Sequence, residues 1–267
     1  MDISVVIPAY NRVDTIARAV ESVLRQSYEA KEIIVVDDGS SDATSEVVKR
    51  YDGVLLLRQK NMGVSAARNN GVMMSSSKWI AFLDSDDTWH KEKLAKQVAF
   101  HKQNITCKAS YTDEEWRKND LHVNVPKRFK KPKNDMLYER MLEDCVVAAS
   151  SLLIEKSLFE SLGGFDESFA VCEDYDFYLR LLHVSEISLI DEKLITKHAG
   201  AENQLGFTHT MLDRWRVRAL ASLHADYPND EKIVATMRKK YAILLENALK
   251  YGEVEAAQRY RSELASI

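Results

Sequence analysis

A run of four apolar residues, Ile80 to Leu83, is followed at once by the acidic residues Asp84, Asp86 and Asp87. A run this short and this apolar predicts a strand of a parallel sheet that is covered on both faces. The carboxylates then stand at the carboxyl end of that strand, where open α/β sheets bind their ligands. Carboxylates this close raise one another's pKa unless a cation lies among them, and oxygen ligands suit Mg²⁺ or Mn²⁺. The run therefore predicts a metal site at a sheet edge, with a solvated acidic turn as the alternative.

Three further strand patterns precede this run, at residues 3–7, 33–36 and 54–57. Segments with apolar residues at helical spacing separate the patterns, and their expected helix caps are Asn11 or Asp14 and Ser41 or Asp42. Strands that alternate with helices predict right-handed βαβ units on a mostly parallel sheet. Polar residues follow three of the strands, at residues 8–12, 37–40 and 84–87. Because these strand ends share one edge of the sheet, we expect one crevice lined by all three segments.

The second half of the chain is less regular. A helix opens at Glu173 and Asp174, because Phe177 and Leu181 follow at helical spacing. Acids in a first helical turn are favoured by the helix dipole, so a structural role is the alternative for this pair. Shorter patterns predict helices over residues 92–103 and 156–162 and strands over residues 109–112, 146–154 and 194–196. Residues 113–144 hold little periodicity and include the basic run 127–133. That run predicts a solvated loop or a contact with an anionic acceptor, a lipid phosphate or a membrane surface.

The tail of the chain has a helical pattern and no evident chemistry. Apolar spacing from Met211 to Leu223 predicts one helix that ends near Pro228, and two more follow over residues 233–250 and 253–264, joined at Gly252. These two resemble a single tetratricopeptide-like hairpin, and one copy is not a repeat array. We expect an appendage that packs against the rest of the chain or forms a homodimer.

Composition narrows the class of protein. The 267 residues suffice for one large α/β domain or for a domain with an appendage. The net charge of −4 argues against nucleic acid as the main partner. The three cysteines are an odd number without a Cys-x-x-Cys pair, which favours reduced thiols in a cytosolic protein. No apolar run approaches the roughly 18 residues of a bilayer span, and the start of the chain does not look like a signal peptide. We expect a soluble cytoplasmic protein. If it contacts a membrane, we expect the contact at the inner face.

Five segments, in their order along the chain, resemble the motifs of inverting family 2 glycosyltransferases, which have the GT-A fold. They are Ser4–Asn11, Val35–Asp42, Gly63–Asn69, Phe82–Asp87 and the pair Glu173–Asp174. The resemblance covers residues 1–198 and fades within residues 113–144. It implies a GT-A domain over residues 1–205 and a helical extension over residues 206–267. Within the domain, residues 1–112 would bind the nucleotide-sugar, and residues 113–205 would bind the acceptor and supply the catalytic base.

The resemblance also implies roles for individual residues. The nucleobase would be held by Pro8, Tyr10 and Asp38, the rest of the nucleotide by Arg68, Asp84 and Ser85, and the metal by Asp86, Asp84 and His198; the catalytic base would be Asp174, with Glu173 beside it. An acceptor hydroxyl that loses its proton to Asp174 would displace the nucleoside diphosphate in one inverting step. Mg²⁺ or Mn²⁺ would neutralise the leaving diphosphate. The expected donor is a UDP-sugar, and the acceptor a glycan, lipid-linked or protein hydroxyl. A lone histidine such as His198 is as often structural.

Other functions share parts of this pattern. Asp84 to Thr88 matches the Asp-x-Asp-x-Thr motif of haloacid dehalogenase phosphatases, but that function leaves residues 37–40 and 63–69 unexplained. A dinucleotide or P-loop site would need a glycine-rich motif after the first strand, and none is there. A non-catalytic nucleotide-sugar binder is the remaining alternative, and it would not need Asp174.

Overall fold

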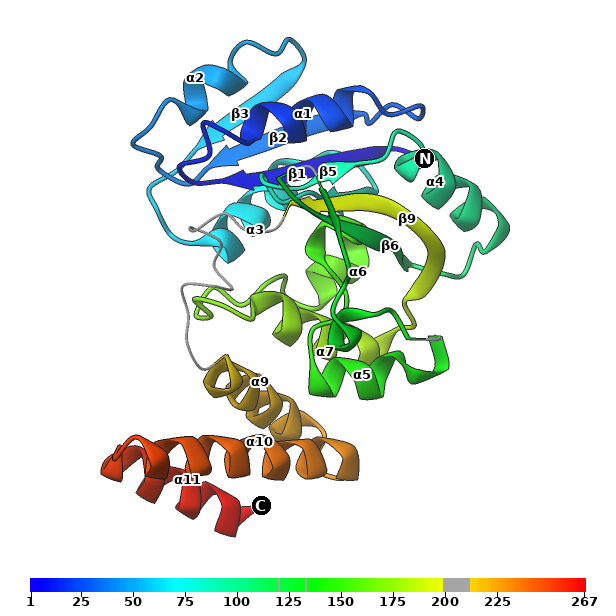
Figure 1. The fold of residues 1–267 in the computed structure, drawn as a ribbon. Coiled ribbons are helices and arrows are strands. Elements are labelled where there is room, and N and C mark those ends of the chain that lie inside the picture. Colours follow the sequence, from blue (N-terminus) through cyan, green and yellow to red (C-terminus); the bar gives the residue numbers. More distant parts are fainter. Residues whose placement is uncertain (120, 133, 199–211) are drawn as a thin grey trace.

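The structure is a computed structural model that describes residues 1–119, 121–132, 134–198 and 212–267. A nine-stranded sheet, in the order β3-β2-β1-β4-β8-β6-β9-β5 with β7 paired to β6, runs through the body of the molecule. Helices lie on both sides of the sheet, and three C-terminal helices form a layer at the end remote from α2 (Figure 1). The predicted α/β fold class, with helices flanking the sheet and helices at the C-terminus, is confirmed.

The first half of the sheet is parallel. It consists of β1 (Ile3–Ala9), β2 (Glu32–Asp37), β3 (Val54–Arg58) and β4 (Trp79–Phe82), with β1 between β2 and β4. Alternate residues of β1 enter different cores: Val5 packs with α1 (Ile16–Leu24) and α4 (Lys93–Gln103), and Val6 packs on the opposite face. That opposite face is covered by α3 (Val64–Met74), and α2 (Thr44–Val48) follows β2. Burial on both faces explains why β1, β2 and β4 are short and almost wholly apolar, whereas β3, at the edge of the sheet, is only partly buried.

The second half of the sheet is mixed. Short β8 (Leu153–Glu155) runs antiparallel to β4, and long β6 (Ala109–Lys118) and β9 (Ser188–His198) pair in parallel. Two-residue β5 (Thr88–Trp89) and β7 (Leu121–Val123) pair antiparallel with β9 and β6. The remaining elements of this half are the helices α5 (Leu137–Glu143), α6 (Lys156–Ser161) and α7 (Glu173–Val184) and the 3₁₀ turns η1 (Lys127–Phe129), η2 (Asn134–Met136) and η3 (Ala149–Ser151).

Four sequence predictions are wrong or incomplete in this half. Residues 146–154 are not one strand: η3 interrupts them, because the Ser151 and Leu152 amides donate to the Ala148 and Ala149 carbonyls at 2.9 and 3.1 Å instead of to a neighbouring strand. The strands predicted over residues 109–112 and 194–196 extend far beyond those limits. The basic run is not simply a solvated loop either, because the Lys131 ammonium is buried 2.8 Å from the Glu114 carboxylate.

The predicted helix caps are confirmed only in part. Thr15, not Asn11 or Asp14, directly precedes α1, and no side chain caps that helix. Ala43 directly precedes α2, but the Asp42 carboxylate accepts a hydrogen bond at 2.9 Å from the amide of Thr44, the first residue of that helix. The same carboxylate accepts a hydrogen bond from the Val13 amide at 3.1 Å, so Asp42 also joins the loop before α1 to the start of α2.

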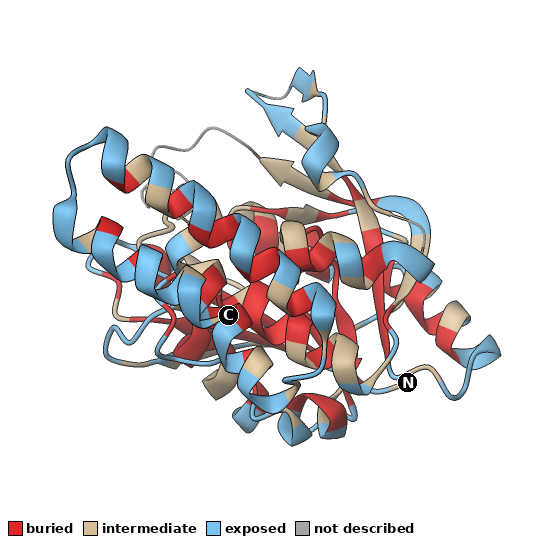
Figure 2. Cartoon of the chain, turned by 90° about the horizontal axis from the view of Figure 1, so that it is seen from below, coloured by how far each residue is buried: buried red, intermediate tan, exposed pale blue. Residues whose placement is uncertain are grey.

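The C-terminal helices were located correctly, at α9 (Asp213–Asp226), α10 (Glu231–Lys250) and α11 (Val254–Ser266). Leu220 and Leu244 of these helices belong to the same apolar cluster as Phe82 of β4 and Phe177 of α7. Figure 2, seen from the side of these helices, shows buried positions in stripes between exposed ones. The helices therefore pack on the body of the protein. Within the described residues, no helix combines the length and the apolar character that a bilayer crossing requires.

Candidate functional site

The polar segments predicted to line one crevice do meet at one edge of the sheet, where β1, β2 and β4 end. Ala9 of β1 is paired with Asp37 of β2, and β4 ends at Phe82, opposite Val6. Pro8 is buried in β1. The pairing of β1 with β4 ends before Pro8, so the proline, which has no N–H, does not interrupt a hydrogen bond between these two strands. Tyr10 follows the strand and its side chain is 45% exposed. A flat aromatic face is thus presented to solvent at the sheet edge.

Asp38 organises the loop that enters α3. Its buried carboxylate accepts hydrogen bonds from Gln59 Nε2 at 2.8 Å and from the Met62 and Gly63 amides at 2.9 and 2.8 Å. Gly63 adopts φ +94°, which a side chain would resist, and α3 begins at the next residue. A carboxylate has about four lone-pair sites, so Asp38 retains one for a ligand.

Arg68 of α3 connects the two halves of the chain. Its Nη2 lies 2.7 Å from Asp84 Oδ1 and its Nη1 lies 2.7 Å from Glu173 Oε1. Burial opposes the charge of Arg68, but the two carboxylates outweigh burial and raise its pKa. Burial likewise tends to raise the pKa of Asp84, and Arg68 and Lys197 hold that pKa below its usual value. The structure therefore brings together three residues that sequence reasoning placed in the site.

The acidic loop is crowded, as the sequence predicts. Burial, together with the charges of Asp86 and Asp84, raises the pKa of Asp87 to about 7, although Lys197 acts in the opposite direction. Ser85 is buried within this loop, and the Asp86 carbonyl accepts a hydrogen bond from Arg18 at 2.7 Å. A buried carboxyl whose pKa is raised beside two further carboxylates is an arrangement that a cation would relieve.

Lys197 is a site residue that sequence reasoning missed. Its Nζ lies 3.6 Å from Asp87 Oδ2, and the surrounding carboxylates outweigh burial and raise its pKa. The only available signal was its position next to His198. The pairing of Thr88 with Thr196 brings His198 to the end of the acidic loop, where its Nε2 lies 3.1 Å from Thr88 Oγ1.

The described part of the chain holds no ready-made group of three histidine, cysteine or acidic side chains that could enclose a metal. This does not argue against Mg²⁺, which is usually held by one or two carboxylates while substrate phosphates and waters complete its shell. Asp86 and Asp84 fit such an open site, with His198 at its margin. Sequence reasoning proposed the same three residues.

Glu173 and Asp174 begin α7, which Arg68 links to Asp84 at the edge of the sheet. Glu173 is buried, and burial and the charge of Asp174 raise its pKa to about 6 against the opposing effect of Arg68. Asp174 is less buried, and its Oδ1 accepts a hydrogen bond from the Tyr175 amide at 2.7 Å. Cys172, directly before the pair, adopts φ +63°. Such a conformation costs energy in a residue other than glycine, and residues of this kind concentrate at functional sites.

Comparisons with known proteins agree with this geometry. The model of the family "Glycosyl transferase family 2" matches residues 4–163. An uncharacterized glycosyltransferase of Rickettsia prowazekii is 31% identical over 205 residues, which are 74% of this chain and 64% of that protein. The chain thus spans somewhat less than two thirds of that relative's length. The Escherichia coli UDP-Glc:alpha-D-GlcNAc-diphosphoundecaprenol beta-1,3-glucosyltransferase WfgD is 33% identical over 193 residues, 71% of this chain and 73% of that protein.

The fold has a close counterpart among solved structures. The crystal structure of S. aureus TarS 1-349 in complex with UDP-GlcNAc superposes with a TM-score of 0.79 at 18% identity. The match covers 99% of this chain and 80% of that one. The match extends to the C-terminal helices as well as the sheet.

Proposed function

Because the chain belongs to glycosyl transferase family 2, we propose that it transfers a hexose from a UDP-sugar to an acceptor hydroxyl with inversion at the anomeric carbon. The phosphatase alternative is wrong, since the family match includes the acidic motif at residues 84–88 on which that alternative depended. The observation that carries the proposal is the Asp84–Arg68–Glu173 chain of ion pairs. It fixes the nucleotide edge of the sheet to the start of α7, so one crevice holds the acidic loop and Asp174.

The nucleotide would lie along the ends of β1 and β2. Tyr10 offers an exposed aromatic face, Pro8 supports it from the strand, and Asp38 has an acceptor site left for the imide N–H of uracil. Arg68, Asp84 and Ser85 would lie toward the ribose and phosphates. The names of WfgD and of the TarS complex support a UDP-sugar donor.

The reaction separates a diphosphate from the sugar, so negative charge grows on the leaving group. Asp86, Asp84 and His198 would hold Mg²⁺ or Mn²⁺, which as a Lewis acid neutralises that charge without a proton donor. Lys197 adds a fixed positive charge 3.6 Å from Asp87, at the same side of the loop.

Asp174 would take the proton of the acceptor hydroxyl. Glu173 is a poorer candidate for this base, because it is buried and one of its oxygens is paired with Arg68. A single displacement converts an α-linked donor into a β-linked product, which agrees with the beta-1,3 linkage in the name of WfgD. The same name supports a lipid-linked glycan as the acceptor class. Contact of the basic run with a membrane and dimerisation through the C-terminal helices stay predictions.

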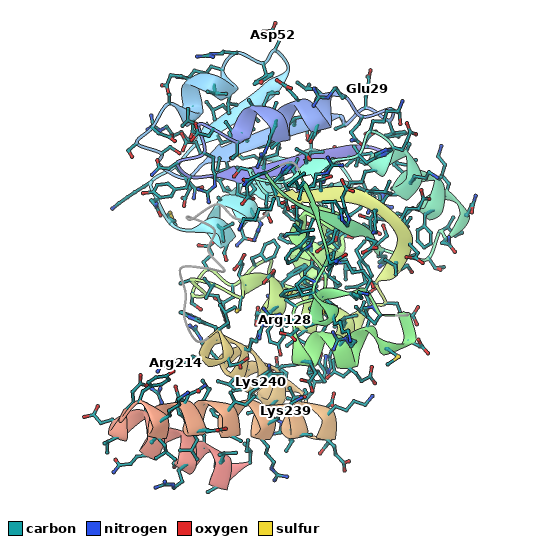
Figure 3. All side chains as sticks on the ribbon, in the orientation of Figure 1. Glu29, Asp52, Arg128, Arg214, Lys239 and Lys240 are labelled. Carbon is teal, nitrogen blue, oxygen red and sulfur yellow. The ribbon has the colours of Figure 1, made fainter. Side chains whose placement is uncertain are left out.

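The experiment is a screen of UDP-sugars with Mn²⁺ present, in which released UDP is measured by mass spectrometry and UDP binding by calorimetry. One UDP-sugar should release UDP, and a chelator should weaken UDP binding. Asp86→Ala should weaken it to the same degree, whereas Asp52→Ala, an exposed turn residue remote from the crevice (Figure 3), should leave it unchanged. Equal UDP affinity with and without metal would reject the metal assignment. Binding without release from any sugar would favour a non-catalytic binder.

A further inference from the structure

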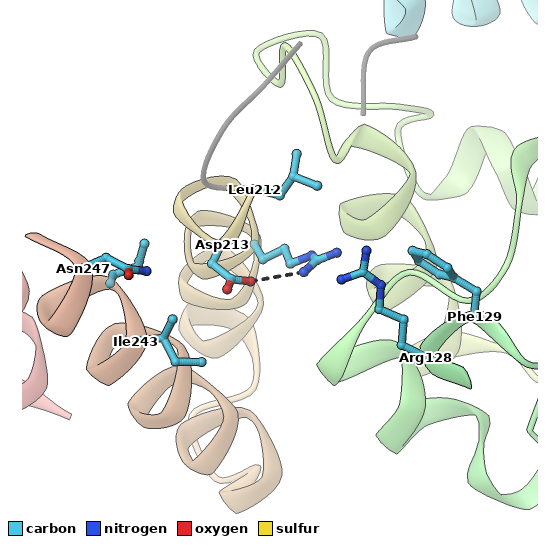
Figure 4. Close-up of a pocket in the computed structure, with 8 residues that line it drawn as sticks. Arg128, Phe129, Leu212, Asp213, Ile243 and Asn247 are labelled. Carbon is cyan, nitrogen blue, oxygen red and sulfur yellow. Dashed lines mark hydrogen bonds and ion pairs between the residues drawn. The ribbon is translucent and has the colours of Figure 1, made fainter. Parts of the chain in front are cut away.

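A second cavity, of about 290 Å³, lies between η1 and the C-terminal helices (Figure 4). Arg128 and Phe129 line it from η1, Leu212 and Arg216 from the start of α9, and Ile243 and Leu244 from α10. None of the residues that line it belongs to the nucleotide or metal site described above. Arg128 comes from the basic run at residues 127–133, to which the proposed function gives no role. This volume is at the lower end of the roughly 300–1,000 Å³ of ligand pockets, so it suits one compact chemical group.

The two arginines of this cavity have unused hydrogen-bond donors. Arg128 is exposed, and its guanidinium stacks 4.8 Å from the centre of the Phe129 ring, which leaves the edge of the guanidinium plane open. Arg216 is 13% exposed and pairs with Asp144 at 3.1 Å and Asp213 at 3.2 Å. Its Nε is buried and has no hydrogen-bond partner within the described part of the chain. A buried donor without an acceptor is costly, so the surroundings of the Arg216 guanidinium are not fully satisfied.

The charge around the cavity favours an anion. Lys240 lies 3.1 Å from Asp213, so Arg128, Arg216 and Lys240 together face two carboxylates, those of Asp213 and Asp144. The surplus is positive and partly shielded from water, which attracts anions. Arginine forks match the oxygens of phosphate groups in geometry.

The opposite wall is mostly apolar. Leu212, Leu244 and Ile243 line it together with one polar side chain, that of Asn247, and Ile243 is 41% exposed although it lies beside the cavity. A sugar would need several hydrogen-bonding side chains, and this wall offers one. A phosphate joined to an apolar chain would satisfy both sides.

The cavity adjoins the start of α7. Cys172 Sγ lies 3.9 Å from the Leu212 carbonyl oxygen, and Leu212 lines the cavity. Cys172 immediately precedes Glu173 and Asp174, and the charges of both Asp174 and Arg216 act on its thiol. A group held in the cavity is therefore on the side of the proposed base, where an acceptor approaches, and away from the ends of β1 and β2.

From these observations we propose that the cavity binds the phosphate or diphosphate of an acceptor in which that group is joined to an apolar chain. The inference rests on the proposed function, since it names the acceptor of that same reaction. Arg128 and Arg216 bind the anionic oxygens, and the chain lies along Leu212 and Ile243.

The test is calorimetry of the whole chain with farnesyl diphosphate, in the presence of saturating UDP and Mg²⁺ so that the nucleotide crevice is filled. A charge-assisted hydrogen bond lost in Arg128→Ala should weaken binding roughly tenfold or more. Arg216→Lys keeps the charge but loses Nε and the planar fork, so it should also bind more weakly. Lys130→Ala is the matched control, because Lys130 is an exposed cation of the same run that does not line the cavity. It should bind like the unmodified protein.

Ligand variants separate the parts of the proposal. Farnesol should not bind, and inorganic pyrophosphate should bind more weakly than farnesyl diphosphate. Ile243→Asn should reduce the difference in affinity between farnesyl diphosphate and pyrophosphate. Equal binding by Arg128→Ala and Lys130→Ala, or no binding by the unmodified protein, would overturn the site, and equal affinities for pyrophosphate and farnesyl diphosphate would overturn the apolar component. UDP binding is titrated separately. Its absence alongside Arg128-dependent farnesyl diphosphate binding would reject the donor assignment and leave the cavity assignment in place.

Discussion

At the residue scale, two adjacent acids at the start of α7 have different surroundings. Glu173 is buried and paired with Arg68, whereas Asp174 is less buried and bonded to the first-turn amide of Tyr175. A base must reach a substrate proton, so it needs an accessible carboxylate, and a positioning acid needs a fixed partner. The pair is therefore proposed to divide into a positioning acid, Glu173, and a catalytic base, Asp174.

Asp174→Asn tests that division. Asparagine keeps the shape and the helix start but cannot accept the proton, so transfer should fall by about 10²–10⁴ while UDP binding stays close to normal. The matched control is Glu231→Gln, because Glu231 is an acid in the first turn of α10. A first-turn acid that acts only on the helix dipole contributes roughly 0.3–1 kcal/mol to stability and nothing to transfer. Transfer rates are measured with the donor found in the screen, and a near-normal rate for Asp174→Asn would remove Asp174 from the mechanism.

Glu173 should give a pH-dependent contribution to stability. Its pKa is raised from 4.5 to about 6, so the folded chain holds this proton more tightly than the unfolded chain between those values. Stability contributed by protonated Glu173 is present at low pH and is lost as the pH rises through this window. Glutamine cannot titrate, so the unfolding free energy of the unmodified protein should fall by about 1–2 kcal/mol relative to Glu173→Gln between pH 4 and pH 7. Urea unfolding at both pH values measures these free energies. If the difference between the two proteins is the same at pH 4 and pH 7, the pKa of Glu173 is not raised.

At the element scale, α3 lies very close to the sheet. A Cβ added to Gly71 would overlap Cγ1 of Val6 in β1 and lie 3.2 Å from Cγ2 of Val36 in β2. Overpacking costs about 1–3 kcal/mol, against a gain in helix propensity of up to about 1 kcal/mol for Gly→Ala. Gly71→Ala should therefore lower the unfolding free energy. Met73→Ala, on the exposed side of the same helix, should change it by less than about 0.5 kcal/mol in urea unfolding. A stabilised Gly71→Ala would mean that α3 shifts freely on the sheet.

The parallel half of the sheet was readable from sequence because both faces of its strands are apolar and each strand ends in polar residues. The strands β6 and β9 were largely missed, since outward-facing charged residues such as Glu115 and Lys193 interrupt their apolar pattern. The place of Asp84 and Asp86 directly after a strand could be predicted from the apolar run before them. The pairing of Arg68 with Glu173 could not, because these residues are 105 positions apart and meet only when the two halves close together. Lys197 gave no periodic or motif signal.

At the scale of the whole molecule, two connections make the halves and the tail interdependent. Arg68 joins the nucleotide half to α7, and α9 and α10 complete the apolar cluster that contains Phe82, Tyr175 and Phe177. Removing one member of a buried ion pair typically costs about 3–5 kcal/mol. The crevice is therefore expected to depend on packing at both ends of α7.

Leu220→Ala tests whether the C-terminal helices stabilise the sheet. Leu220 is fully buried in α9 within that shared cluster, so its truncation should cost about 2–5 kcal/mol through lost burial and a residual cavity. If the cluster unfolds as one unit, amide hydrogen exchange should accelerate in β1 and β4 as well as in α9. Leu249→Ala, 56% exposed on α10, serves as the control and should leave exchange unchanged in all of them. Amide hydrogen exchange is measured by mass spectrometry. If exchange becomes faster only within residues 212–267, and β1 is protected as before, the C-terminal helices unfold independently of the sheet.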